Sequence, residues 1–273
     1  MKEERITVIG LGKMGSILCR SMLDKGIVSR NNLVGCDPRQ ENREDLKQEL
    51  EIEVVADNKE GIKSAHTVIL AVTPQVIDQV LFDIGDHLKR EQTLISIVAG
   101  IPISYLEDKL IKPVPVIRVM PNMAASVKEA MTAVVCGHYA TEKEKKRSIR
   151  IFSSIGHVVP LKEEMMDIVT GLSGSGPAYI YLIIEALSDG AVLMGMEREA
   201  ARVFAAQTVL GAARMVLEGD LHPAQLREIV TSPGGTTISA LKHLESDGVR
   251  GSMIRAVEAA TRRSRELGQG QFS

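Results

Sequence analysis

The sequence predicts an α/β protein in which a doubly wound parallel sheet is followed by a second, all-α domain. Strand and helix signals alternate to about residue 160, a glycine-rich turn joins the first strand to the first helix, and only helical signals follow. A length of 273 residues is sufficient for about two domains. We therefore divide the chain into a sheet domain, residues 1–162, and a helical domain, residues 163–273.

Short apolar runs in the first domain predict its strands. They lie at residues 5–9, 32–36, 53–55, 67–71, 93–98, 116–120 and 132–136. Helical signals fall between several of these runs, at residues 13–25, 40–50, 59–64 and 76–88. This alternation implies right-handed βαβ units, which place helices on both faces of a parallel sheet.

The second domain is predicted to be entirely helical. Its helices are expected at residues 178–196, 198–218, 223–229, 236–246 and 249–267, with Gly219 and Gly248 as helix stops. Residues 179–184 and 203–216 are apolar on most faces, so they must be buried. A helical interface between subunits buries them, which predicts a homodimer or larger homo-oligomer. The alternative is a compact domain whose apolar surface is covered by the first domain.

Composition excludes several classes of function. The formal net charge is −2, aromatic residues make up 3% and tryptophan is absent, so we expect no nucleic-acid partner. The three cysteines are far apart in the sequence, which argues against a disulfide framework or a metal site. The charged start of the chain does not resemble a signal peptide, and no apolar run reaches the roughly 20 residues of a membrane span. We expect a cytoplasmic protein without a membrane partner.

A glycine-rich motif follows the first predicted strand and opens the first helix. Gly10, Gly12 and Gly15 form the pattern G-x-G-x-x-G. Gly10 permits a tight turn, Gly12 lets the backbone approach a pyrophosphate, and Gly15 allows close packing of helix on strand. The helix N-terminus offers free N–H groups to the phosphates. The motif therefore predicts a Rossmann-like dinucleotide site, and a glycine-rich turn without a ligand is the alternative.

Asp37 ends the second predicted strand, 22 residues after Gly15. An acid there accepts hydrogen bonds from the adenosine ribose and repels a 2′-phosphate, which favours NADH. Arg39 and Arg43 lie close enough to turn toward a 2′-phosphate and so favour NADPH. Asp37 is also suited to cap the helix that begins after Pro38, which is compatible with the ribose role. On balance the cofactor is NADPH or NADH, with a slight lean to NADH.

A second glycine-rich loop lies between two predicted helices of the C-terminal domain. It comprises Ser232, Pro233, Gly234, Gly235, Thr236 and Thr237. Its N–H groups at a helix start are suited to hold a carboxylate, with a threonine hydroxyl making one further bond. The same residues are equally suited to a plain helix cap in which Thr236 or Thr237 satisfies the free N–H groups.

Taken together, these motifs resemble the pyrroline-5-carboxylate reductase family. Residues 226–241, LREIVTSPGGTTISAL, are similar to that family's C-terminal signature. Residues 172–179, LSGSGPAY, and 118–122, RVMPN, match its interdomain and central motifs. The resemblance spans essentially the whole chain, and its C-terminal signature is the specific part. It implies a domain that binds NAD(P)H and a helical domain that forms an interlocked dimer.

The resemblance also implies individual site residues. The cofactor contacts it implies are Ile9, Gly10, Leu11, Gly12, Lys13, Met14, Asp37, Arg39, Asn58, Ala71, Val72, Thr73, Pro74, Val98, Ala99, Gly100 and Asn122. The substrate carboxylate is expected on Ser232, Gly234, Gly235 and Thr236, with Thr237 bonded to the ring nitrogen as the catalytic residue, across the dimer interface from the cofactor. No metal is implied. Four positions depart from the family pattern: Thr73, Met123, Ala124 and Lys128.

The implied reaction is hydride transfer to the C=N carbon of a cyclic imine acid, 1-pyrroline-5-carboxylate, which gives L-proline and is the last step of its biosynthesis. A protonated imine is already electrophilic, so positioning can supply most of the catalysis. Alternatives are another imine reductase, a β-hydroxyacid dehydrogenase-like enzyme or a non-enzymatic dinucleotide sensor. The dehydrogenases need a proton-transferring lysine, and residues 177–191 contain none. A sensor has no use for the second glycine-rich loop.

Overall fold

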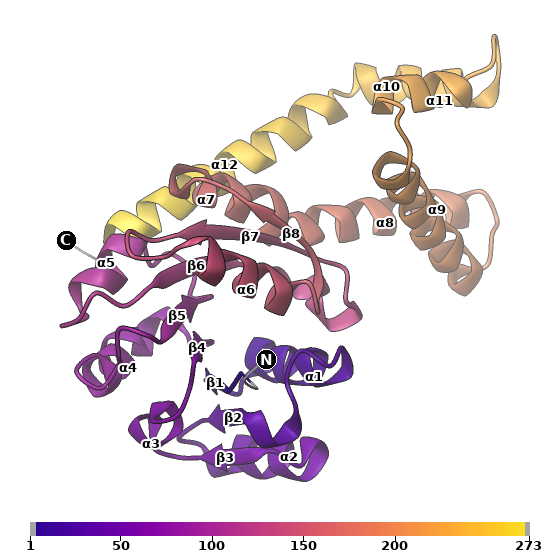
Figure 1. Cartoon of the computed structure of the whole chain (residues 1–273). Helices are drawn as coiled ribbons and strands as arrows, with labels where there is room; N and C mark the ends of the chain where they lie inside the picture. The colour runs from indigo at the N-terminus through magenta and orange to yellow at the C-terminus, as the bar shows by residue number, and fades with distance from the viewer. Residues whose placement is uncertain (1–3, 271–273) are drawn as a thin grey trace. The chain divides into compact units, whose positions relative to one another are not determined.

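A computed structural model describes residues 4–270 of the chain. It divides into two compact units: residues up to Gly174 together with those from Thr261 onward, and Ser175–Ala260. The first unit is built on a single eight-stranded sheet in the order β3-β2-β1-β4-β5-β6-β7-β8 (Figure 1). Its strands are β1 (Ile6–Ile9), β2 (Leu33–Cys36), β3 (Glu53–Val55), β4 (Thr67–Leu70), β5 (Thr93–Ser96), β6 (Val116–Met120), β7 (Ala130–Cys136) and β8 (Gly156–Pro160).

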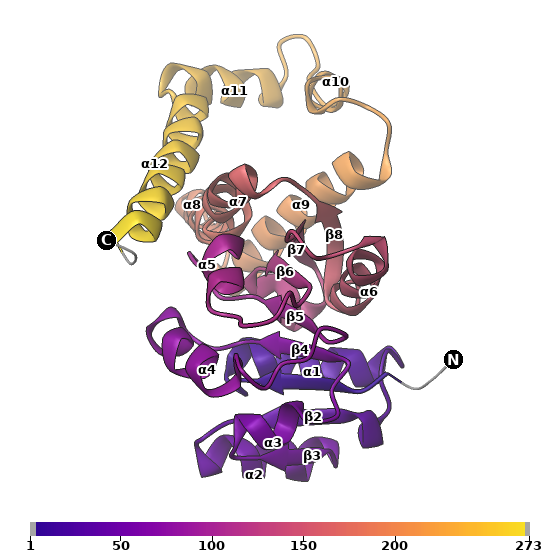
Figure 2. The same cartoon turned by 60° about the vertical axis from the view of Figure 1, so that its left-hand side comes forward.

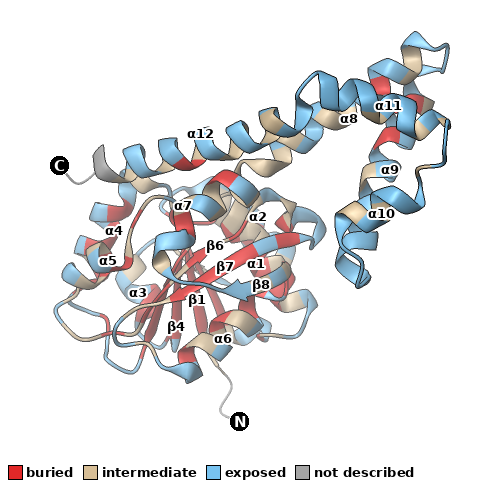
Figure 3. Ribbon diagram, turned by 90° about the horizontal axis from the view of Figure 1, so that it is seen from above, coloured by how far each residue is buried: buried red, intermediate tan, exposed pale blue. Residues whose placement is uncertain are grey.

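Helices cover both faces of this sheet, as the alternating pattern predicts (Figures 1 and 2). They are α1 (Lys13–Asp24), α2 (Gln40–Leu50), α3 (Asn58–Ile62), α4 (Ile77–Ile84), α5 (Ile103–Asp108), α6 (Glu142–Phe152) and α7 (Met166–Val169). Side chains of α3, α4, α5 and α7 form one apolar core with the sheet, and those of α1, α2 and α6 form the other. The strands between the two cores are the most thoroughly buried part of the unit (Figure 3). The predicted α/β class is confirmed.

The sheet is not parallel throughout. Strands β1 to β6 are parallel, whereas β7 runs antiparallel to β6 and β8 runs parallel to β7. The reason is the short link at residues 121–129, because a parallel connection needs a crossover of a dozen or more residues. Strand β8 and helices α5 and α6 also lie outside the elements that the sequence analysis predicted.

The second unit is helical, in agreement with the prediction. Its helices are α8 (Gly176–Leu193), α9 (Arg198–Glu218), α10 (Pro223–Ile229), α11 (Thr236–Ser246) and the first part of α12 (Val249–Gly270). Only Ser188, Ala201 and Ala205 are buried in residues 175–260, all of which the structure describes. A unit of this size that buries so little cannot offset its conformational entropy alone.

Two helical stretches of the structure are long and apolar enough to cross a bilayer, Glu163–Leu193 and Arg198–Glu218. Length and composition are weak evidence for a membrane span, because helices that pack between subunits or in a core have the same composition. The first stretch also includes a π-helical segment, η5 (Thr170–Gly174), between α7 and α8. Bends of this kind interrupt the regular hydrogen-bond ladder.

Candidate cofactor and substrate sites

The turn between β1 and α1 has the geometry that the three glycines predict. Gly10 has a φ of +94°, and a Cβ there would lie 2.6 Å from the Ala71 carbonyl oxygen. A Cβ on Gly15 would lie 1.9 Å from the Gly10 oxygen, so helix and turn pack too closely for any side chain. Gly12 differs, since a Cβ on it meets no atom within 4 Å. The protein itself leaves space above Gly12, at the start of α1, where a phosphate can approach the free N–H groups.

Asp37 lies directly after β2 and is 3% exposed. Its Oδ2 accepts hydrogen bonds from the Leu11 backbone N–H and the Asn42 side chain, both at 2.9 Å. Its Oδ1 accepts one from the Arg39 backbone N–H at 2.9 Å and a longer one from Arg39 Nε at 3.4 Å. Burial raises the pKa of Asp37, but the bonds from Asn42, Arg39 and Leu11 together hold it below its ordinary value. Asp37 is therefore a fixed carboxylate beside the glycine turn.

The two arginines near Asp37 are placed differently. The Arg39 side chain is 67% exposed and has only the 3.4 Å contact with Asp37. Arg43 donates through Nη1 to the carbonyl oxygens of Asp37 at 2.9 Å and Pro38 at 2.7 Å. Arg39 is free to move toward a ligand, whereas Arg43 is held by the backbone.

A pocket of about 730 Å³ lies at the carboxyl ends of β1, β2 and β4. It brings together nine of the residues predicted to contact the cofactor: Ile9, Gly10, Gly12, Asp37, Arg39, Asn58, Ala71, Val72 and Thr73. Among residues 4–270, Asn58 Oδ1 is one of three buried side-chain atoms without a hydrogen-bond partner. A buried polar atom without a partner is costly, and a ligand that donates to it removes that cost. The open space above Gly12 and the free Asn58 oxygen both fit a dinucleotide in this pocket.

The other predicted cofactor residues lie outside this pocket. Leu11 and Lys13 line a smaller cavity of about 450 Å³ that shares Gly12 with it, and Met14 packs against the core beneath α1. Pro74 follows Thr73 at the start of a short 3-10 turn. Val98, Ala99 and Gly100 follow β5, where Val98 is buried and Ala99 exposed. Asn122 follows β6 and bonds to the protein's own backbone at Ser173 and Met131.

Seven further residues line the pocket that sequence reasoning did not select: Pro38, Ala56, Asp57, Val76, Gln79, Val80 and Asp83. Asp57 caps α3 through a 2.8 Å bond from the Lys59 N–H, which is a signal visible in the sequence as an acid before a helix. Val76 is 45% exposed and supplies apolar wall. The positions of Gln79 and Asp83 depend on how α4 packs, for which the sequence contains no local signal.

The second glycine-rich loop precedes α11. Gly234 has a φ of +67°, and a Cβ on Gly235 would lie 2.3 Å from Ser232 Oγ. Gly235 is the N-cap of α11, and no side chain caps this helix. A threonine cap, one of the two sequence-based interpretations, is thus not formed. The first-turn N–H groups of Thr236 and Thr237 remain at the positive end of an 11-residue helix.

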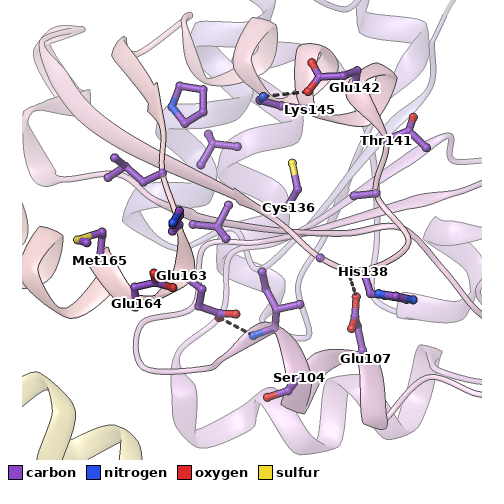
Figure 4. Close-up of a pocket in the computed structure, with 18 residues that line it drawn as sticks. Ser104, Glu107, Cys136, His138, Thr141, Glu142, Lys145, Glu163, Glu164 and Met165 are labelled. Atoms are coloured by element: carbon purple, nitrogen blue, oxygen red, sulfur yellow. Dashed lines mark hydrogen bonds and ion pairs between the residues drawn. The ribbon is translucent and has the colours of Figure 1, made fainter.

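A larger cavity, of about 1,020 Å³, lies where β7 ends (Figure 4). Since β7 runs antiparallel to β6, this is the edge of the sheet away from the glycine turn. Two of its acidic side chains accept hydrogen bonds from backbone N–H groups of the protein itself. Glu107 accepts one from His138 at 2.7 Å, and Glu163 accepts one from Ile103 at 2.8 Å. These bonds stabilise loops and helix ends, so the cavity's size does not make it the better candidate.

Within residues 4–270, no three His, Cys, Asp or Glu side chains are grouped so that they could hold a metal ion. Two of the three cysteines, Cys19 and Cys36, are buried. Burial raises the pKa of Cys19 and of Cys36 to about 12, which keeps both thiols protonated. The chemistry available in the described residues is therefore that of a nucleotide pocket and an exposed anion cradle.

Two family models match the chain. One is described as pyrroline-5-carboxylate reductase dimerisation and covers residues 163–267, and the other as NADP oxidoreductase, coenzyme F420-dependent, over residues 5–100. A pyrroline-5-carboxylate reductase of Methanosarcina acetivorans is 45% identical over 269 residues, which cover 98% of this chain and 100% of the relative. The one from Arabidopsis thaliana is 40% identical and covers 97% and 96% of the two chains.

Solved structures agree with these matches. The pyrroline-5-carboxylate reductase of Coxiella burnetii has a TM-score of 0.92 at 34% identity, with 97% of this chain and 99% of that chain covered. The Plasmodium falciparum pyrroline carboxylate reductase, solved with NADP bound, has a TM-score of 0.87 at 32% identity and 98% and 99% coverage. Full-length identity of this order, together with the nucleotide pocket and the loop before α11, shows that the chain belongs to the pyrroline-5-carboxylate reductase family.

Proposed function

We propose that this protein reduces the C=N bond of 1-pyrroline-5-carboxylate to give L-proline, with NADPH or NADH as the hydride donor. The observation that carries the proposal is the presence of two complementary sites in one family member. One is the pocket beside Gly12, and the other is the uncapped N-terminus of α11 behind Gly234 and Gly235. The bound cofactor supplies the hydride, and the protein's residues supply binding and orientation.

In this proposal the cofactor's pyrophosphate rests on the N–H groups at the start of α1, where Gly12 leaves space. Asn58 and Asp37 hold the adenosine end of the pocket. Ala71, Val72 and Thr73 line the wall that follows β4. Leu11, Lys13, Met14, Pro74, Val98, Ala99 and Gly100 remain proposed contacts. The resemblance also implies a contact from Asn122, but its amide is bonded to the backbone at Ser173 and Met131, so we do not include it among them.

The substrate carboxylate is proposed to bind the first-turn N–H groups of α11, near Ser232, Gly235 and Thr236. Thr237 is half-buried, and among residues 4–270 its hydroxyl makes no hydrogen bond. The nearby Thr231 differs, because its hydroxyl donates to the Arg227 carbonyl at 2.7 Å. A free hydroxyl at this position is available to the ring nitrogen of the imine acid. We propose that the loop acts across a dimer interface, on the cofactor held by the other subunit.

The dimer is supported by the second unit's surface. Large apolar side chains of α8 and α9 are exposed in the single chain, including Tyr181 at 66% and Phe204 at 65%. Exposure of this extent is typical of a surface that another subunit covers. A homodimer or larger homo-oligomer is therefore part of the proposal, and a cytoplasmic location stays a prediction of the sequence analysis.

The preference between the two cofactors is proposed to lean slightly to NADH. Asp37 places a fixed negative charge where a 2′-phosphate would approach, and its 3.4 Å contact with Arg39 is the weakest of its bonds. A ribose hydroxyl can replace that contact. Arg39, once displaced, can pair with the 2′-phosphate, which allows NADPH to bind as well. The test of the whole proposal is oxidation of NADH or NADPH that depends on added pyrroline-5-carboxylate and yields proline; a protein inactive with both cofactors contradicts it.

A further inference from the structure

The carbonyl oxygen of Ser173 lies where the π-helical segment η5 meets the start of α8. In a continuous α-helix this oxygen accepts a hydrogen bond from the N–H of residue 177, four positions later. Residue 177 is a proline, which has no N–H to donate. The Ser173 carbonyl therefore needs a donor from elsewhere in the protein.

Asn122 supplies that donor. Its Nδ2 donates to the Ser173 oxygen at 2.9 Å, and its Oδ1 accepts from the Met131 backbone N–H at 3.3 Å. Because a carbonyl can only accept and a backbone N–H can only donate, these two partners fix the orientation of the amide. One side chain thus connects the end of β6, the start of β7 and the η5 segment.

The segment that Asn122 holds continues into one of the two covalent connections between the units and is hydrogen-bonded to the helix that makes the other. The first connection follows Gly174, immediately after η5, and the second precedes Thr261, in α12. Within the first unit, Ser264 of α12 donates through Oγ to Asp167 Oδ1 at 2.6 Å, and Asp167 lies in α7. Helix α7 and η5 are continuous, so residues 166–174 anchor both ends of the second unit to the first.

We propose that Asn122 is a positioning residue for hydride transfer, which acts by holding residues 166–174 in place and not by touching the cofactor. This inference rests on the proposed function. The substrate loop belongs to the second unit, whose first connection continues from this segment and whose second lies in a helix bonded to it. Loss of the anchor leaves the cofactor pocket intact but lowers the fraction of molecules with a productive geometry, since small displacements of reacting groups are costly in rate.

The first test uses Asn122→Asp in the full chain, which keeps the size of the side chain and the acceptor for Met131 but removes the donor to Ser173. We expect kcat for pyrroline-5-carboxylate to fall about tenfold or more, the size of one lost hydrogen bond to an unpaired carbonyl. The Kd of the cofactor, measured by fluorescence titration, is expected to stay within about twofold. Asn31→Asp, the same change at an exposed asparagine, serves as the control and changes neither.

A second test restores the missing donor. Asn122→Ala removes the hydrogen bond to the Ser173 carbonyl, and Pro177→Ala in the same chain restores a backbone N–H at position 177. We expect hydrogen exchange of the backbone amides at residues 170–178 to be faster in Asn122→Ala than in the wild type. The double variant is expected to slow this exchange again and to recover part of kcat.

Two results overturn the proposal. If cofactor affinity weakens as much as kcat falls, Asn122 contacts the cofactor. If exchange at residues 170–178 is unchanged in both Asn122 variants, Asn122 does not anchor the segment. Hydrogen exchange can be measured without turnover. A wild-type protein that is inactive on the imine therefore contradicts the proposed function alone. The anchoring role is then decided by whether exchange at residues 170–178 is faster in Asn122→Ala and slower again in the double variant.

Discussion

The carboxylate of Asp37 accepts a hydrogen bond from the backbone N–H of Leu11, with 2.9 Å between Oδ2 and the nitrogen. This bond ties the end of β2 to the glycine turn after β1. The two strands are neighbours in the sheet, so residues 26 positions apart in sequence meet at one end of it. Asp37 therefore has a structural role in shaping the pocket as well as a negative charge that faces it.

Replacement of Asp37 by serine separates these two roles. Asp37→Ser removes the charge that disfavours a 2′-phosphate, so we expect the ratio of kcat/KM for NADPH to that for NADH to rise about tenfold, equivalent to about 1.4 kcal/mol. Steady-state kinetics with both cofactors measure this ratio. An unchanged ratio shows that Asp37 does not discriminate between the cofactors.

The lowered pKa of Asp37 predicts an acid-dependent contribution to stability. The group binds its proton more weakly when folded than when unfolded, so its contribution is present above its ordinary pKa of 3.8 and is lost as pH falls through the lower folded value. We expect the wild type to have a higher Tm than Asp37→Asn near pH 6. This difference should shrink as pH falls below 3.8. A difference in Tm that stays constant from pH 6 to acid contradicts a role for the ionised form.

Thr237 and Thr231 form a matched pair for testing the substrate site. Thr237→Ala removes the free hydroxyl, and we expect kcat/KM for the imine to fall roughly tenfold to hundredfold, the size of a hydrogen bond to a charged partner. The Kd of the cofactor should not change. Thr231→Ala removes only a local bond to the Arg227 carbonyl, and its kinetics should stay near those of the wild type. Equal losses in the two variants indicate that the loop is merely structural.

Lys128 tests one of the departures from the family pattern. It has a φ of 62°, in the left-handed region, and its Nζ lies 2.9 Å from Asp24 Oδ2 in an exposed ion pair. Substitutions by alanine and by glycine both remove the ion pair with Asp24. An alanine at this position still has a Cβ that makes a positive φ unfavourable, whereas a glycine has none and adopts this φ without strain. We expect Lys128→Gly to be more stable than Lys128→Ala by about 1 kcal/mol in urea unfolding. The reverse order contradicts the account of this turn.

Local sequence patterns were sufficient for much of this fold. The predicted limits of α2, α9, α10 and α11 agree with the structure, and glycine or proline marks several of them: Gly219 follows α9, Pro223 begins α10 and Gly235 precedes α11. The glycine turn was predictable for the same reason, since Gly10 and Gly15 occupy positions where no Cβ fits. Such signals act over a few residues and need no knowledge of the tertiary fold.

Contacts between residues far apart in the sequence could not be predicted from such local patterns. Arg118 pairs with Glu163 at 3.0 Å, although 45 positions separate them and neither has a local signal for the other. The bond between Asn122 and Ser173 depends on a π-helical segment and on the return of β7 beside β6. The reversed direction of β7 follows from a short link whose path the propensities of single residues do not determine.

The central claim is tested most directly by following cofactor oxidation by the purified full-length protein with pyrroline-5-carboxylate, NADH and NADPH, while proline is quantified in the same samples. We expect oxidation only when the imine acid is present, one proline formed for each cofactor consumed, and a kcat/KM somewhat higher with NADH than with NADPH. Oxidation that produces no proline, or no imine-dependent oxidation with either cofactor, contradicts the assignment of this chain as a pyrroline-5-carboxylate reductase.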